Sequence, residues 1–125
     1  MNYISKNDKT TIIASFRKYS RLGLANEKLS PFDAYDRIRG VCKNKSEALD
    51  LLAVYDTMRL LRISNKTEVI KAVYAVYFGS LGKKPKKNEI SDRVLRHATE
   101  NYCDERTVYR QLEYAKKLYL MLRSN

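Results

Sequence analysis

The sequence has few of the residues that interrupt helices or bind metals. Its 125 residues include four glycines, two prolines, two cysteines, one histidine and no tryptophan. A structural zinc site needs three or four cysteine or histidine ligands, and only Cys42, Cys103 and His97 are present, far apart or without partners. Such a site is effectively excluded, and we expect reduced thiols, no metal and no cofactor.

The sequence also lacks any long apolar run. The opening residues, MNYISKNDKTTI, contain no stretch of signal-peptide length, and no segment is long and apolar enough to cross a bilayer. Hydrophobic residues nevertheless make up 44% of the chain, which is enough for a core and excludes a disordered tail. We therefore expect a soluble, cytoplasmic protein that does not contact a membrane.

Acidic residues are the minority among the charged ones. Lysine and arginine total 25 against 14 aspartates and glutamates, which gives a formal net charge of +11. A surplus of this size in a small protein indicates attraction to a polyanion such as nucleic acid. A generic basic surface is the alternative, so charge alone does not identify the partner.

Apolar residues recur at helical spacing almost throughout, which predicts an all-α protein of about six helices. Residues able to cap a helix start mark the beginnings of five of them. These residues are Asp8, Ser30 before Pro31, Ser46, Ser64 and Asp104. The predicted helices cover about 8–22, 30–42, 46–62, 64–78, 89–102 and 104–122.

The second helix is predicted to bury Tyr35, Ile38 and Val41. The fourth is apolar on most sides from Val69 to Phe78 and rich in β-branched and aromatic residues, so a strand is the alternative there. Its length and its connection to the preceding helix favour a buried central helix. We divide the chain into a helical N-terminal region, 1–62, and a three-helix unit, 63–125.

The last two predicted helices have the pattern of a helix-turn-helix, in which a support helix and a second helix pack together around a tight turn. Asp104 can cap the second helix, whose outer side then carries Glu105, Arg106, Tyr109, Arg110 and Glu113. Arginine can form a bidentate hydrogen bond with guanine, and tyrosine can reach a phosphate or a thymine methyl. The residues predicted to pack between the two helices are Val94, Ala98, Cys103, Val108 and Leu112.

The run from Asp104 to Leu112, DERTVYRQL, followed by Ala115, resembles the recognition helix of sigma-factor region four. The wider stretch from Val69 to Leu122 resembles the phage and prophage late-gene transcriptional regulators of the ArpU/RinA type. This resemblance implies a transcription activator at a phage promoter inside a bacterial host cell. Carried over residue by residue, it places Arg106, Thr107, Tyr109 and Arg110 nearest the DNA.

The support helix departs from the common pattern at three positions. Many helix-turn-helices have glycine in the turn where this chain has Tyr102. The polar residues His97 and Asn101 occupy positions that are usually apolar. We therefore expect a longer support helix and a turn that is reached in a different way.

Several lysines near this unit are candidates for contact with DNA phosphates. Four of them form a basic loop before the support helix, and two lie on the last helix. A solvated surface without a ligand is the alternative for all of them. They are Lys83, Lys84, Lys86, Lys87, Lys116 and Lys117.

These features predict a sequence-specific regulator that binds double-stranded DNA. The N-terminal helices are expected to oligomerise, with a dimer favoured, or to meet RNA polymerase. A small-terminase-like DNA-packaging subunit and a helical protein-interaction module are the alternatives. No catalytic constellation is evident, because the carboxylates are scattered and no serine or cysteine has a histidine nearby in sequence.

Overall fold

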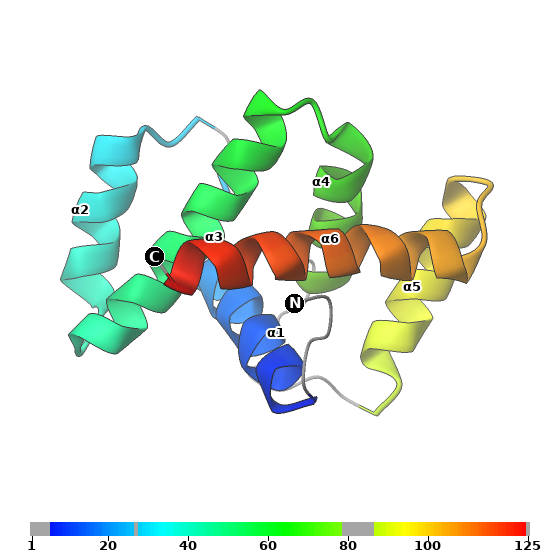
Figure 1. The fold of residues 1–125 in the computed structure, drawn as a ribbon, viewed down its shortest axis with the longest axis horizontal. Coiled ribbons are helices and arrows are strands. Elements are labelled where there is room, and N and C mark those ends of the chain that lie inside the picture. Colours follow the sequence, from blue (N-terminus) through cyan, green and yellow to red (C-terminus); the bar gives the residue numbers. More distant parts are fainter. Residues whose placement is uncertain (1–5, 27, 79–86, 125) are drawn as a thin grey trace.

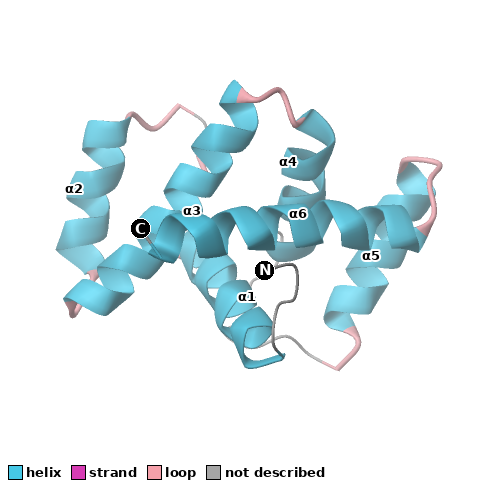
Figure 2. Ribbon diagram, in the orientation of Figure 1, coloured by secondary structure: helices cyan, strands magenta, loops and turns pink. Residues whose placement is uncertain are grey.

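A computed structural model describes residues 6–26, 28–78 and 87–124, and this part of the chain contains helices and no strand (Figures 1 and 2). The predicted all-α fold with about six helices is confirmed. The helices are α1 (Lys6–Arg21), α2 (Pro31–Val41), α3 (Lys45–Ile63), α4 (Thr67–Val73), the π-helical turn η1 (Tyr74–Phe78), α5 (Glu89–Glu100) and α6 (Glu105–Ser124).

Helix α6 crosses the whole molecule and organises the packing of the other helices (Figure 1). It packs against α5 and α4 along its first part and against α3 and α1 further along. Helix α2 lies at the opposite end from α5 and packs mainly on α3. A single helix, α6, therefore contacts α5, α4, α3 and α1.

Aromatic rings from three distant segments meet in the middle of the core. The ring of Phe16 in α1 lies 5.7 Å from that of Tyr77 in η1 and 5.7 Å from that of Tyr119 in α6, measured between centroids. All three side chains are almost completely buried. Burial of such large side chains is the main stabilising contribution of this core. Because Phe16 belongs to the predicted N-terminal region, the boundary expected near residue 62 does not divide the core into two.

A buried ion pair also joins the N-terminal region to the support helix. The guanidinium of Arg17 in α1 is 1% exposed and lies 2.6 Å from the Glu89 carboxylate in the first turn of α5. A buried charge is tolerated only when it is paired. Glu89 also lies 3.9 Å from Arg93, one turn further along α5. These charges fix the position of α5 relative to α1.

The segment from Val69 to Phe78 is helical, as favoured from the sequence, and not a strand. Its last five residues widen into η1, a π-helical turn. Three consecutive residues, Val76, Tyr77 and Phe78, are buried there because α1 covers one side of η1 and α5 covers another.

Three of the predicted helix starts are wrong by a few residues. Helix α1 begins at Lys6, so Asp8 lies inside its first turn. Helix α3 is capped by Asn44, whose side-chain oxygen accepts from Glu47 N at 2.9 Å, and not by Ser46. Ser64 ends α3 and does not begin α4. Only α3 has a neighbouring side chain as its cap, since Lys66 before α4 makes no capping hydrogen bond.

The start of α2 is confirmed, but its buried face is not the predicted one. Ser30 accepts a hydrogen bond from Asp33 N at 3.1 Å, with Pro31 as the first helical residue. Ile38 is buried, whereas Tyr35 and Val41 are 39% and 46% exposed. Ala34 is buried in their place, because the small side chain allows α2 to approach α3 closely.

Candidate nucleic-acid interface

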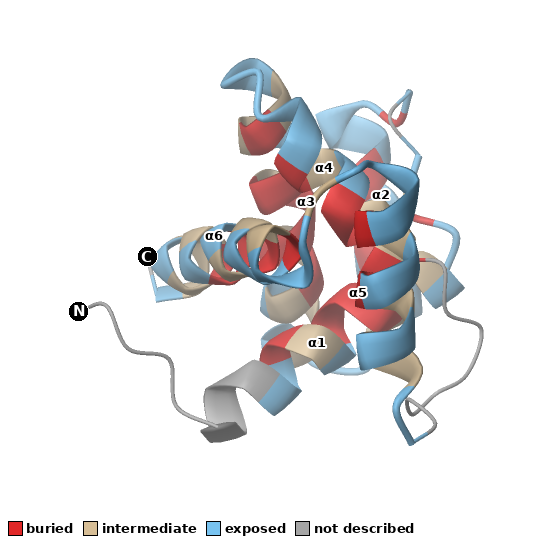
Figure 3. Cartoon of the chain, turned by 90° about the vertical axis from the view of Figure 1, so that its right-hand side faces the viewer, coloured by how far each residue is buried: buried red, intermediate tan, exposed pale blue. Residues whose placement is uncertain are grey.

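Helices α5 and α6 pack together around a four-residue connection, which is the arrangement of a helix-turn-helix. Val94 and Ala98 of α5 and Val108 and Leu112 of α6 are between 0 and 2% exposed. Cys103, in the connection, is half-buried against the same core. In Figure 3, α5 is exposed along the side that turns away from the other helices. The five residues expected to pack between the two helices thus lie in or beside their contact.

The turn between the two helices ends α5 in a Schellman motif. Cys103 N donates to Ala98 O at 3.0 Å, and Tyr102 N donates to Thr99 O at 3.4 Å. Tyr102 has a φ of +54°, the left-handed conformation that this motif needs at the residue after the cap. Tyr102 thus takes the conformation that glycine usually adopts in this turn, and α5 ends at Glu100, two residues before the predicted end at residue 102.

The polar residues of α5 have a local explanation. The side-chain amide of Asn101 donates to His97 O at 2.8 Å and lies 3.2 Å from His97 Nδ1. The Asn101 amide thus adds a second hydrogen bond to the His97 carbonyl, which already accepts from Asn101 N at 3.1 Å at the end of α5.

Asp104 fixes the start of α6. Its carboxylate accepts from Thr107 N at 3.0 Å, which is the capping interaction expected for the residue before a helix. The Thr107 hydroxyl lies 3.5 Å from the same carboxylate oxygen, and the residue is only half-exposed. Thr107 therefore lies with the cap and less fully outward than Arg106 and Arg110.

The outward face of α6 carries a row of basic residues. Arg106, Arg110 and Lys117 are exposed and lie on one side of the helix, one turn and then two turns apart. None of the three forms a hydrogen bond or an ion pair with another described residue. Tyr109 is 44% exposed beside this row. Charges that no protein group neutralises remain available for an anionic ligand.

Two further cations lie on or near these helices and were not among the residues singled out from the sequence. The Lys66 ammonium, just before α4, lies 5.5 Å from the centre of the Tyr114 ring on α6. Arg96 of α5 borders a hollow together with the predicted Lys87, and the acidic Glu89 and Asp92 line it as well. Both Lys87 and Arg96 are exposed. Helical spacing places Arg96 opposite the buried Val94 and Ala98, so its exposure could have been anticipated, whereas the approach of Lys66 to Tyr114 depends on tertiary packing.

One predicted phosphate contact is wrong. Lys116 is 9% exposed, and its ammonium lies 6.0 Å from the centre of the Tyr77 ring, in the contact between α6 and η1. The side chain points to the interior because position 116 lies on the same side of α6 as the buried Leu112 and Tyr119, one turn away in either direction. Its neighbour Lys117 is exposed. Lys83, Lys84 and Lys86 lie outside the described residues.

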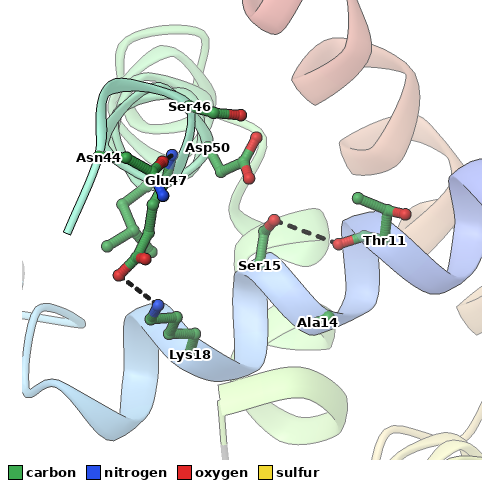
Figure 4. A pocket seen from close by; sticks show the side chains of 9 residues that line it. Thr11, Ala14, Ser15, Lys18, Asn44, Ser46, Glu47 and Asp50 are labelled. Carbon is green, nitrogen blue, oxygen red and sulfur yellow. Dashed lines mark hydrogen bonds and ion pairs between the residues drawn. The ribbon is translucent and has the colours of Figure 1, made fainter. Parts of the chain in front are cut away.

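A second surface feature is a polar hollow of about 380 Å³ between α1 and the start of α3 (Figure 4). Its charged groups are satisfied internally: Lys18 pairs with Glu47, and Asp50 accepts from Arg123 Nε at 2.7 Å. The hydrogen bond from Lys18 lowers the pKa of the Glu47 carboxyl below its ordinary value. These ion pairs link α1, α3 and α6, and they engage all three charged residues that line the hollow.

Burial is the main cause of the pKa shifts of two core tyrosines. Desolvation raises the pKa of Tyr77 and of Tyr119 above the ordinary value for tyrosine, because the charged form would lie in the core. Within the described residues, no three histidine, cysteine or acidic side chains gather as metal ligands would. Nor does this part of the chain contain a helix long and apolar enough to cross a membrane.

Comparisons of the chain with protein-family models, with curated proteins and with solved structures find no match.

Proposed function

We propose that this protein binds double-stranded DNA in a sequence-specific manner and regulates transcription, with the first half of α6 lying in the major groove. The observation that carries the proposal is the pair Arg106 and Arg110. The two arginines lie one turn apart on the exposed side of a capped helix, without protein partners among the described residues. The opposite side of the same helix is packed on α5 by Val108 and Leu112. Major-groove recognition requires this arrangement.

The charge of the whole molecule supports binding to a polyanion. The net charge is +11, and Lys87, Arg96 and Lys117 are further exposed cations on α6 or in the region of α5. Such side chains interact with phosphates and contribute affinity that does not depend on sequence. The likeness of residues 104–112 to sigma-factor region four supports transcription as the process, with RNA polymerase as a further partner and a phage or prophage promoter as the target.

The first experiment selects bound sites from a random duplex pool and then compares two double variants on the enriched site. Arg106→Ala with Arg110→Ala should lower affinity for this site by about 2–6 kcal/mol and remove the preference over a scrambled duplex. Arg37→Ala with Arg39→Ala removes the same charge from exposed positions of α2 and serves as the matched control. It should leave the preference intact.

Two outcomes would contradict the proposal. An absence of any enriched site would show that the protein does not distinguish sequences. An unchanged preference in the Arg106/Arg110 variant would show that α6 does not contact the bases. The regulatory role is tested separately, by adding bacterial RNA polymerase to a template that carries the enriched site and measuring whether the protein changes the yield of transcript.

A further inference from the structure

Helix α3 carries a stripe that the neighbouring helices cover only in part. The residues Leu49, Leu52, Asp56, Arg59 and Ile63 follow one another at alternating spacings of three and four. This spacing places them on one side of the helix, as in the seam between two helices of a coiled coil. Leu49, Arg59 and Ile63 are exposed, whereas Leu52 and Asp56 are half-buried, and Leu52 packs against the edge of the core. The opposite side of α3 faces the core with Leu51, Val54 and Met58.

The two ends of this stripe differ in shape. Near its start, α2 and the end of α6 flank α3, and a hollow of about 140 Å³ is lined there by Tyr35, Leu49, Leu52 and Leu122 among others. Near its end Ile63 is 66% exposed and lies beside a second hollow, of about 170 Å³, which it lines with Arg59, Leu60 and Leu122 among others. The first end is thus recessed, whereas a side chain projects at the second. A face with both features can pair with a copy of itself.

We propose that a second copy of this chain covers the stripe, with the two α3 helices antiparallel about a twofold axis that passes between residues 57 and 58. The register follows from the residues. An axis at this point brings Asp56 of one copy opposite Arg59 of its partner, and the same axis brings Ile63 opposite Leu52. Each projecting Ile63 then enters the recess of the other copy.

Charge favours a second copy over a partner of different composition. With a net charge of +11, two copies repel each other over most of their surfaces. Along the stripe, one carboxylate and one guanidinium balance, and Arg123 at its edge already pairs with Asp50. An acidic partner would be attracted to the basic face of α6 before this neutral one. The stripe is therefore a surface on which like molecules can meet without repulsion.

A dimer supplies the two recognition helices that two half-sites on DNA need, and in this respect it rests on the proposed function. The stripe lies on α3 and beside Leu122, near the end of α6, whereas Arg106 and Arg110 lie on its first two turns. A dimer formed here leaves both basic faces open. The test does not involve DNA, so its failure would leave the proposed DNA binding untouched.

The test measures the mass of the full chain in solution by sedimentation at about 5–200 µM, a range in which a dimer with a micromolar dissociation constant forms and dissociates. The unaltered protein should approach twice the 14.6 kDa of one chain. Ile63→Asp should raise the dissociation constant at least about 30-fold. The matched control is Leu95→Asp, because Leu95 of α5 is 51% exposed and lies off the stripe; it should remain dimeric.

The register is tested by disulfide cross-linking. Leu52→Cys combined with Ile63→Cys should give a cross-linked dimer under mild oxidation, because the two positions lie opposite each other in the pair. Ile63→Cys alone should not, because the two copies of residue 63 would be about 16 Å apart along the helices. A monomer throughout the concentration range, a ring of many copies, or a dimer that persists in Ile63→Asp would each overturn the proposal.

Discussion

The two halves of α6 both carry basic residues but differ in what surrounds them. Residues 105–113 present Arg106 and Arg110 to solvent, while residues 114–124 bring Lys116 and Arg123 into contact with the rest of the molecule. Both halves keep the same apolar spacing, from Val108 to Tyr119. The difference comes from what surrounds them, since the first half meets only α5 and α4 on one side, and the second half crosses α3 and α1. A basic residue on this helix is available to a ligand only where no other helix lies against it.

The largest loss of stability is expected when the buried side chain that packs the second half of α6 into the core is removed. Tyr119→Ala should destabilise the protein by about 3–5 kcal/mol, because a buried ring that touches Phe16 is replaced by a cavity. The Tyr119 hydroxyl also lies 3.1 Å from Ser15 Oγ and 3.4 Å from Asp50 Oδ1, and these contacts are lost with it. Urea denaturation followed by far-ultraviolet circular dichroism measures the change.

The control for this variant is Tyr109→Ala in the first half of α6. Tyr109 is 44% exposed, so its removal should cost less than about 1 kcal/mol. Equal destabilisation by the two variants would show that the first half is packed as tightly as the second, and the difference between the halves would not hold.

Adjacent lysines give a finer comparison. Lys116→Ala should destabilise the protein by about 1 kcal/mol, because it removes a buried stem and a cation–π contact with Tyr77. Lys117→Ala should leave stability unchanged within about 0.5 kcal/mol. On the proposed function it should also reduce the slope of log affinity for duplex DNA against log salt by about 0.9, the contribution of one phosphate contact.

Thermal unfolding and DNA titrations at several salt concentrations separate the two effects. Lys116→Ala should leave the salt slope as it is, because its ammonium lies over an aromatic ring and away from solvent. A loss of slope in Lys116→Ala without loss of stability would mean that this side chain turns outward to meet DNA.

Much of the fold could be predicted because its causes are local. The apolar spacing of Val94, Ala98, Val108 and Leu112 predicted which sides of α5 and α6 meet, and Asp104 predicted where α6 begins. The burial of Lys116 could not be predicted in the same way, since it depends on packing against Tyr77, a residue 39 positions earlier in the sequence. Likewise, nothing near Arg17 indicates that it is buried, because its partner Glu89 is 72 positions away.

The entry to α6 offers the smallest test, at Tyr102. Within the described residues, three helices end in the same type of turn, with Gly23, Asn65 and Tyr102 at the residue of positive φ. The left-handed conformation costs an ordinary residue about 1–2 kcal/mol, and glycine loses about 0.5–1 kcal/mol through the entropy of its unfolded chain. Tyr102 is 97% exposed, so its side chain contributes little packing in return. Tyr102→Gly should therefore stabilise the protein by about 0.5–1 kcal/mol in urea denaturation. Asn65→Gly should change stability less, since asparagine tolerates this conformation, and a loss of stability in Tyr102→Gly would mean that the tyrosine ring holds the turn by a contact of its own.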